Sequence, residues 1–176
     1  MKKRILTTMF AVLSFALLQI SATAQKTYTD KTAGFSVSVP DDWTQEGFET
    51  GQTAFQSYSP DTTGIFSVGL HTFKEGQNSK AYLEWMESYM PDAGYSENFM
   101  PEESRSITGT DAAAYNADEI YCGAYKKTKN GVEMVQMIFI LKSGKYGYSL
   151  IQTCPLENLT ALQPYFDVFL NSFKIL

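Results

Sequence analysis

The feature that most constrains the fold is the stretch from Ala113 to Cys154. Three segments in it, residues 113–127, 132–142 and 145–154, are rich in β-branched and aromatic residues. The dipeptides Asn130-Gly131 and Ser143-Gly144 separate them. Asn-Gly between two such segments is a strong signal for a two-residue hairpin turn. We therefore predict three consecutive antiparallel strands.

Two-residue turns would also fix the strand register. They place Cys122 opposite Phe139, and Phe139 opposite Tyr148. Because side chains alternate between faces, one face is predicted to be the core face. It also carries Ile120, Ala124, Val135, Met137, Leu141, Tyr146 and Leu150.

The opposite face of the predicted meander is mixed. It carries Glu119, Tyr121, Tyr125, Gln136, Ile138, Ser149 and Ile151. If no helix covers it fully, Tyr121 and Tyr125 would line an amphipathic groove together with Glu119 and Gln136. These four residues are the candidate ligand-binding site. The alternative is an ordinary half-polar sheet face that binds nothing.

The rest of the chain predicts an α+β domain, an antiparallel sheet with helices packed on its faces. Further strands are expected at 35–39, 54–58, 65–73 and 104–108, from alternation and turn residues. A helix is expected to begin at Asn78-Ser79 and end at Pro91 and Gly94, with an apolar stripe of Tyr82, Trp85, Met86, Tyr89 and Met90. A last helix spans about 159–171, capped by Asn158, with Pro164 expected in its first turn. Its stripe is Leu162, Phe166, Phe169, Leu170 and Phe173.

The N-terminus has the pattern of a cleavable export signal. Lys2, Lys3 and Arg4 precede an apolar run from 5 to 20, and small residues lead to Ala24. We predict cleavage after Ala24, which leaves a single domain at 25–176 in the periplasm or outside the cell. The apolar run is short for a membrane anchor and contains four polar residues, so stable membrane insertion is not expected.

The predicted mature domain is strongly acidic. Of 14 basic residues, three lie in the signal, which leaves 11 against 19 acidic residues and a net charge of −8. Nucleic acid binding needs a basic surface, so it is not expected. The register places Cys122 and Cys154 far apart, and we predict no disulfide between them. Cys122 is expected to be buried.

No catalytic, cofactor or metal site is predicted. His71 is the only histidine, and no motif for a nucleophile accompanies it. Acidic residues are plentiful but scattered, and the chain lacks a calcium loop and glycine-rich phosphate motifs. A hydrolase with two carboxylates facing a cleft stays open as a third possibility.

Two segments together carry a resemblance. They are Gly34-Phe35-Ser36-Val37-Ser38-Val39-Pro40-Asp41-Asp42-Trp43 and Phe166-Asp167-Val168-Phe169-Leu170-Asn171-Ser172-Phe173-Lys174. Their order and spacing resemble the PsbP-like group, named for the extrinsic subunit of the oxygen-evolving complex. The resemblance implies an α-β-α sandwich around an antiparallel sheet and a non-catalytic role, either binding a partner or stabilising an assembly. Pro40, Trp43 and Phe173 would then be structural.

These observations predict an exported, non-enzymatic binding or accessory domain that engages a protein partner at the cell envelope. The alternative is a protein that binds a small ligand, a glycan or a lipid, on the aromatic groove of the sheet.

Overall fold

The computed structural model describes residues 24–47, 53–88, 98–99, 105–107, 110–129 and 131–176. Several predictions fall outside these ranges. They are the signal peptide before Ala24, the second half of the first helix stripe (Tyr89 and Met90), its end at Pro91 and Gly94, and the turn residue Asn130.

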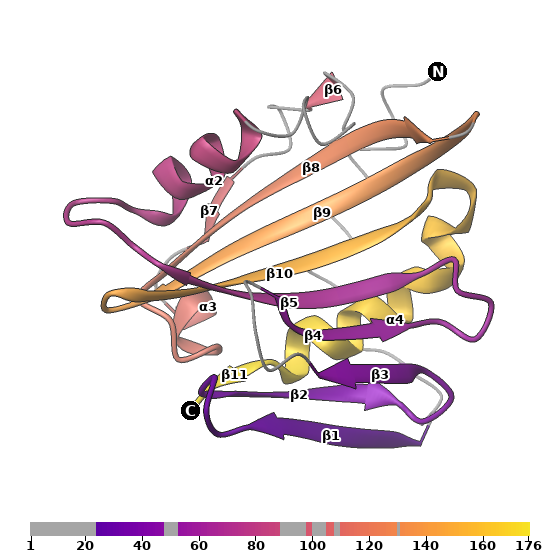
Figure 1. Cartoon of the computed structure of the whole chain (residues 1–176), viewed down its shortest axis with the longest axis horizontal. Helices are drawn as coiled ribbons and strands as arrows, with labels where there is room; N and C mark the ends of the chain where they lie inside the picture. The colour runs from indigo at the N-terminus through magenta and orange to yellow at the C-terminus, as the bar shows by residue number, and fades with distance from the viewer. Residues whose placement is uncertain (1–23, 48–52, 89–97, 100–104, 108–109, 130) are drawn as a thin grey trace.

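The predicted meander forms the centre of an eight-stranded antiparallel sheet (Figure 1). The strands follow the order β3-β4-β5-β10-β9-β8-β6, and β7 also pairs with β8. Their bounds are β3 (Thr44–Gly47), β4 (Thr53–Tyr58), β5 (Ile65–Thr72), β6 (Asn98–Phe99), β7 (Arg105–Ile107), β8 (Glu119–Lys129), β9 (Val132–Ser143) and β10 (Tyr146–Pro155).

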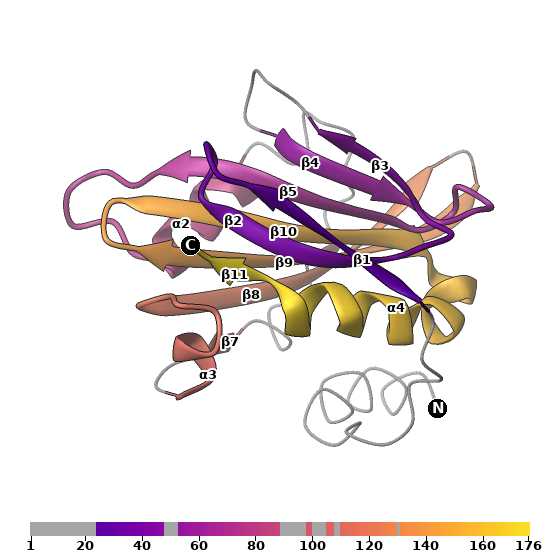
Figure 2. The same ribbon diagram turned by 90° about the horizontal axis from the view of Figure 1, so that it is seen from below.

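A second, three-stranded sheet joins the two ends of the described chain. Its order is β1-β2-β11, with β1 (Gln25–Asp30), β2 (Phe35–Pro40) and β11 (Lys174–Ile175). Figure 2 shows β11 leading out of helix α4 (Leu159–Ser172) and running beside β2. The remaining helices are α2 (Ser79–Glu87), the single turn α3 (Thr110–Ala113) and the 3₁₀ turn η2 (Leu156–Asn158).

The main core lies between one face of the large sheet, helix α4 and strand β2. Trp43 and Phe173 are buried in it, as predicted, and Phe66 stacks on Phe169 with ring centroids 4.1 Å apart. The core face of the meander is confirmed except at one position, since Tyr146 is exposed. All five residues of the predicted α4 stripe are buried.

A smaller core lies on the opposite face of the large sheet, beneath α2. Tyr82 and Leu83 of α2 pack there against Ile138 and Ile140 of β9. Helices therefore cover both faces of an antiparallel sheet, which confirms the predicted α+β class. No helix in the described ranges is long and apolar enough to span a membrane.

The register of the first hairpin is confirmed, and that of the second is wrong by two residues. Cys122 lies opposite Phe139 as predicted, but Phe139 lies opposite Leu150 and not Tyr148. The turn is Gly144-Lys145, because Gly144 takes a φ of 60° and its N–H is held by Asp118 at 2.7 Å. A shift of two residues keeps the same side chains on the same face.

Other boundaries needed correction. Strand β8 begins at Glu119 and not at 113, because residues 114–118 form a turn in which Asn116 has a φ of 58°. Pro164 is the sixth residue of α4 and so lies beyond the first turn, where we expected it. Proline has no N–H to donate to the carbonyl group one turn earlier, but the position is exposed and water can hydrogen-bond that carbonyl instead. Asn158 occupies the capping position, but its side chain donates to Thr63 instead. Trp85 lies at the edge of the α2 stripe, and Leu83 is buried in its place.

Candidate functional site

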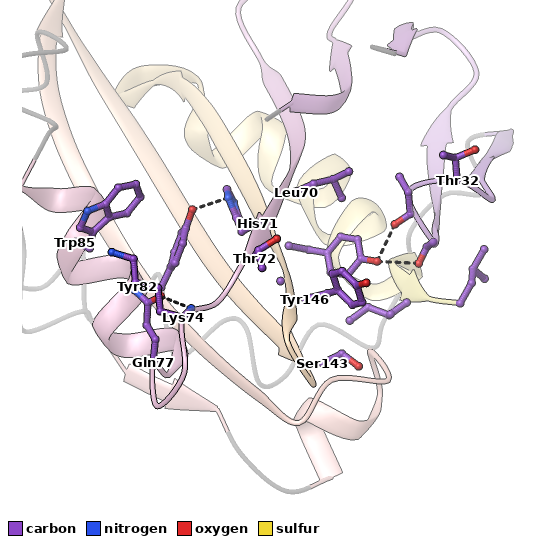
Figure 3. Close-up of a pocket in the computed structure, with 16 residues that line it drawn as sticks. Thr32, Leu70, His71, Thr72, Lys74, Gln77, Tyr82, Trp85, Ser143 and Tyr146 are labelled. Carbon is purple, nitrogen blue, oxygen red and sulfur yellow. Dashed lines mark hydrogen bonds between the residues drawn. The ribbon is translucent and has the colours of Figure 1, made fainter. Parts of the chain in front are cut away.

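A groove of about 850 Å³ lies at one end of the domain, where the two sheets and α2 approach one another (Figure 3). Its walls come from five segments that are distant in the sequence. They are the β1–β2 turn (residues 32–34), the end of β5 with the following loop (70–77), α2, the β9–β10 hairpin (143–148) and the last two residues (175–176). A site of this volume can hold a small ligand or a few side chains of a partner.

Large apolar side chains that face solvent gather around this groove. Among the described residues, four large hydrophobic side chains are exposed: Trp85 (43%), Val132 (43%), Tyr146 (56%) and Leu176 (66%). Trp85, Tyr146 and Leu176 all line the groove, whereas Val132 lies in the β8–β9 hairpin. We call these three residues the groove rim. Figure 3 shows Trp85 and Tyr146 well apart, with Tyr82 and Lys74 between them.

One wall is anchored by His71 of β5. Its Nδ1 lies 2.6 Å from the hydroxyl of Tyr82 in α2, and the two rings are 4.6 Å apart. Burial lowers the pKa of His71 to about 4, so the imidazole is neutral at pH 7. Its Nε2 is shielded from solvent and has no hydrogen-bond partner among the described residues. The pair fixes α2 against the end of the sheet.

The facing wall is the turn between β1 and β2. The hydroxyl group of Tyr148 donates a hydrogen bond to the carbonyl oxygen of Ala33 at 2.8 Å. The hydroxyl oxygen of Tyr148 also lies 3.2 Å from the carbonyl oxygen of Gly34. The turn is closed by Asp30, whose carboxylate accepts the N–H groups of Thr32 and Ala33. Gly34 takes a φ of 73°, a conformation that glycine adopts readily. Both walls are therefore held by hydrogen bonds before anything binds.

Lys74 is the one charged side chain in the groove lining. Polar groups of Thr32, Thr72, Gln77 and Ser143 lie between the apolar rim residues. No side chain of the lining carries a carboxylate or a thiol, and the imidazole of His71 is neutral at pH 7. This mixture of apolar surface with hydroxyl, amide and ammonium groups can pack against a bound molecule and form hydrogen bonds with it. The arrangement suits binding.

The four residues predicted as a ligand site lie beneath α2 and do not line this groove. Glu119 accepts hydrogen bonds from the backbone N–H and the hydroxyl of Ser79. The ring of Tyr121 lies under the ammonium of Lys80, and Tyr125 donates to Glu87 at 2.7 Å. Gln136 donates to Thr153 of β10. Tyr125 and Gln136 are 3% and 6% exposed. Their role toward a ligand stays a prediction.

Sequence reasoning missed the groove because its walls are assembled by tertiary contacts. One signal was available in principle. Trp85 lies at the edge of the α2 stripe, and Tyr146 directly follows a turn, so both positions are less suited to a core than their neighbours. His71 lies on the face of β5 opposite Phe66 and Val68, which is the face that α2 covers.

Sequence comparison finds no matching protein family and no matching curated protein. Structure comparison does find similar folds. Cyanobacterial PsbP from Synechocystis matches with a TM-score of 0.66 at 10% identity, over 92% of this chain and 98% of that chain. The Ran-binding protein Mog1p of Saccharomyces cerevisiae matches with a TM-score of 0.58 at 9% identity, over 88% and 96%.

LpqN, involved in cell envelope biogenesis of Mycobacterium tuberculosis, matches with a TM-score of 0.55 at 11% identity, over 88% of this chain and 86% of LpqN. At such low identities the likeness concerns the fold alone. The chain has the PsbP-like fold, as the two sequence motifs indicated.

Proposed function

We propose that the chain is an exported binding protein, without catalytic activity, that engages a protein partner at the cell envelope through the groove. The observation that carries this proposal is the rim itself. Three of the four exposed large hydrophobic side chains in the described ranges surround one concave site. Exposed aromatic side chains in a concave, preformed site are typical of the residues that contribute most to protein interfaces.

The known proteins with this fold support the proposal. One of them is a Ran-binding protein, and another takes part in cell envelope biogenesis. The N-terminal signal pattern favours export of this chain to the envelope or beyond it.

Site-specific photo-crosslinking in the producing cells tests the proposal. A benzophenone amino acid is placed at Tyr146 on the rim or, as a matched control, at Val132, which is exposed but lies in the β8–β9 hairpin. We expect a discrete cross-linked protein species from position 146 only, and we expect Trp85→Ser to abolish it. An identical pattern from both positions, or no species from position 146, would refute a partner in the groove.

A second candidate is a small-ligand binder, for a glycan or a lipid. It is favoured by the size of the groove and by the hydroxyl and amide groups between its rim residues. The four residues under α2, Glu119, Tyr121, Tyr125 and Gln136, are the other proposed contacts for such a ligand. Native mass spectrometry of protein purified gently from its own compartment separates the two candidates, because a bound small molecule adds a discrete mass.

A further inference from the structure

We infer that the groove recognises a peptide segment that carries an acidic residue beside a large apolar side chain. This inference rests on the proposed function and names the chemistry of the partner. It draws on the distribution of charge around the groove, on the lysines that are left available there, and on the polar groups between the rim residues.

The side chains that line the groove include one lysine and no acidic residue, although the chain as a whole is acidic. Lys74 lines the groove, and Lys31, Lys142, Lys145 and Lys174 each adjoin a lining residue in the sequence. These five are nearly half of the 11 basic residues that follow Ala24. Among the 19 acidic residues, Glu75 and Glu84 adjoin lining residues in the sequence, and the carboxylates of Asp30 and Asp118 near the groove are engaged by backbone N–H groups of Thr32, Ala33 and Gly144. Charge of one sign around a concave site favours an occupant of the opposite sign.

The lysines divide into two groups by their contacts. The ammonium groups of Lys142 and Lys174 donate to the carbonyl oxygens of Gln77 and Ala114, which fixes them in the structure. Lys74 and Lys31 make no ion pair with any residue in the described ranges, and Lys145 lies 5.1 Å from the ring centroid of Tyr146. Cations are therefore available beside the aromatic rim, where a carboxylate next to an apolar side chain would meet both.

The lining favours a peptide over an acyl chain. The polar side chains of Thr32, Thr72, Gln77 and Ser143 line the groove together with the apolar ones. An acyl chain would bury these groups without hydrogen bonds, which is unfavourable. The backbone N–H and C=O groups of a peptide satisfy them, while its apolar side chain packs between Trp85 and Tyr146.

The test is selection from a random peptide library displayed on phage, with the purified 25–176 domain as bait, at low ionic strength. We expect enriched peptides with Asp or Glu next to an aromatic or branched apolar residue. The binding of a synthetic peptide of that consensus should weaken about tenfold in Trp85→Ser, and about fivefold in Lys74→Glu. Added salt should reduce the loss of binding caused by Lys74→Glu and should leave the loss caused by Trp85→Ser unchanged. Lys126→Glu, the same charge change at the far end of β8, serves as the control and should change little.

Three outcomes would overturn the inference. Enriched peptides without acidic residues that still need Trp85 would refute the charge argument and leave the proposed function in place. Equal recovery of the same peptides on Trp85→Ser would place peptide binding outside the groove. Groove-dependent binding on a glycan array, with no peptide enriched, would assign the site to a sugar. The cross-linking experiment at Tyr146 reads the proposed function independently of these results.

Discussion

The hydroxyl of Tyr82 lies 2.6 Å from Nδ1 of His71, and this contact ties helix α2 to the end of strand β5. Both side chains line the groove. Trp85 lies one turn further along α2, with its ring 5.3 Å from that of Tyr82. This hydrogen bond is therefore one of the contacts that position the side of the groove rim that carries Trp85, together with the packing of α2 on the sheet and the hydrogen bond from Tyr125 to Glu87.

Removal of this hydrogen bond is expected to destabilise the domain. In Tyr82→Phe the buried Nδ1 of His71 loses its partner, and the free energy of unfolding should fall by about 1–3 kcal/mol. Urea denaturation followed by circular dichroism measures it. Tyr165→Phe is the matched control, because Tyr165 packs against Trp43 and its hydroxyl makes no hydrogen bond among the described residues. Its effect should stay within about 0.5 kcal/mol. Equal losses in both variants would contradict this role for Tyr82.

The free energy of unfolding should decrease as the pH is lowered, because His71 takes up a proton more readily in the unfolded chain. Its pKa is about 4 in the folded protein, because burial disfavours the imidazolium, and 6.5 is the ordinary value for the unfolded chain. Between these values the unfolded state binds more protons, so protonation favours unfolding as the pH falls. The full shift amounts to about 3 kcal/mol between pH 7 and pH 4.

Comparison with His71→Gln isolates this contribution. Unfolding free energies of both proteins are measured between pH 7 and pH 4, and the wild type should lose more. Burial raises the pKa of Glu87 and of Asp167, and these shifts make the free energy of unfolding increase as the pH is lowered. Both residues are present in both proteins, so their contributions cancel in the difference. Parallel curves for the two proteins would contradict the assignment to His71.

Both cysteines should resist thiol reagents in the folded protein. Cys122 and Cys154 are buried, no disulfide joins them, and burial raises the pKa of Cys154 to about 12. They lie opposite Phe139 and Val135 of β9, about 13 Å apart along the strands, which is too far for a disulfide. Ellman's reagent should label neither thiol in buffer and both in denaturant. An intact mass lower by two hydrogens would contradict the register.

The central meander was predictable because its strands are adjacent in sequence and are joined by short turns. The first hairpin was placed correctly, and the face pattern survived the error in the second, since a shift of two residues preserves alternation. The turn between β9 and β10 was predicted at the wrong position, because its place depends on Asp118. This residue precedes β8 and is distant in sequence from Gly144. That contact leaves no local signal.

The short strands and the groove were not predictable for a related reason. Strands β1, β3 and β11 are only six, four and two residues long, and each is defined by its pairing with a neighbouring strand. β11 pairs with β2 across almost the whole chain. The groove rim combines a residue of α2, the first residue of β10 and Leu176, so it exists only after the two sheets have come together.

The last prediction concerns Gly147, which lies opposite His71 in the pairing of β10 with β5. A Cβ atom at this position would lie 2.1 Å from Cε2 of Phe73, a buried ring that packs against Tyr82 with centroids 5.2 Å apart. Gly147→Ala should therefore displace this ring and destabilise the domain by about 1–3 kcal/mol. Phe73→Leu removes the clashing ring atoms and creates a small void of its own.

A double-mutant cycle tests this contact. If the clash with Phe73 is the cause, Gly147→Ala should destabilise the Phe73→Leu protein less than the wild type, with a coupling of about 0.5 kcal/mol or more. Additive losses would mean that the alanine acts through the backbone of β10 instead. Since Phe73 also supports Tyr82, the single variant should weaken the His71 contact and reduce partner cross-linking from Tyr146 as well, and Phe73→Leu should partly restore it.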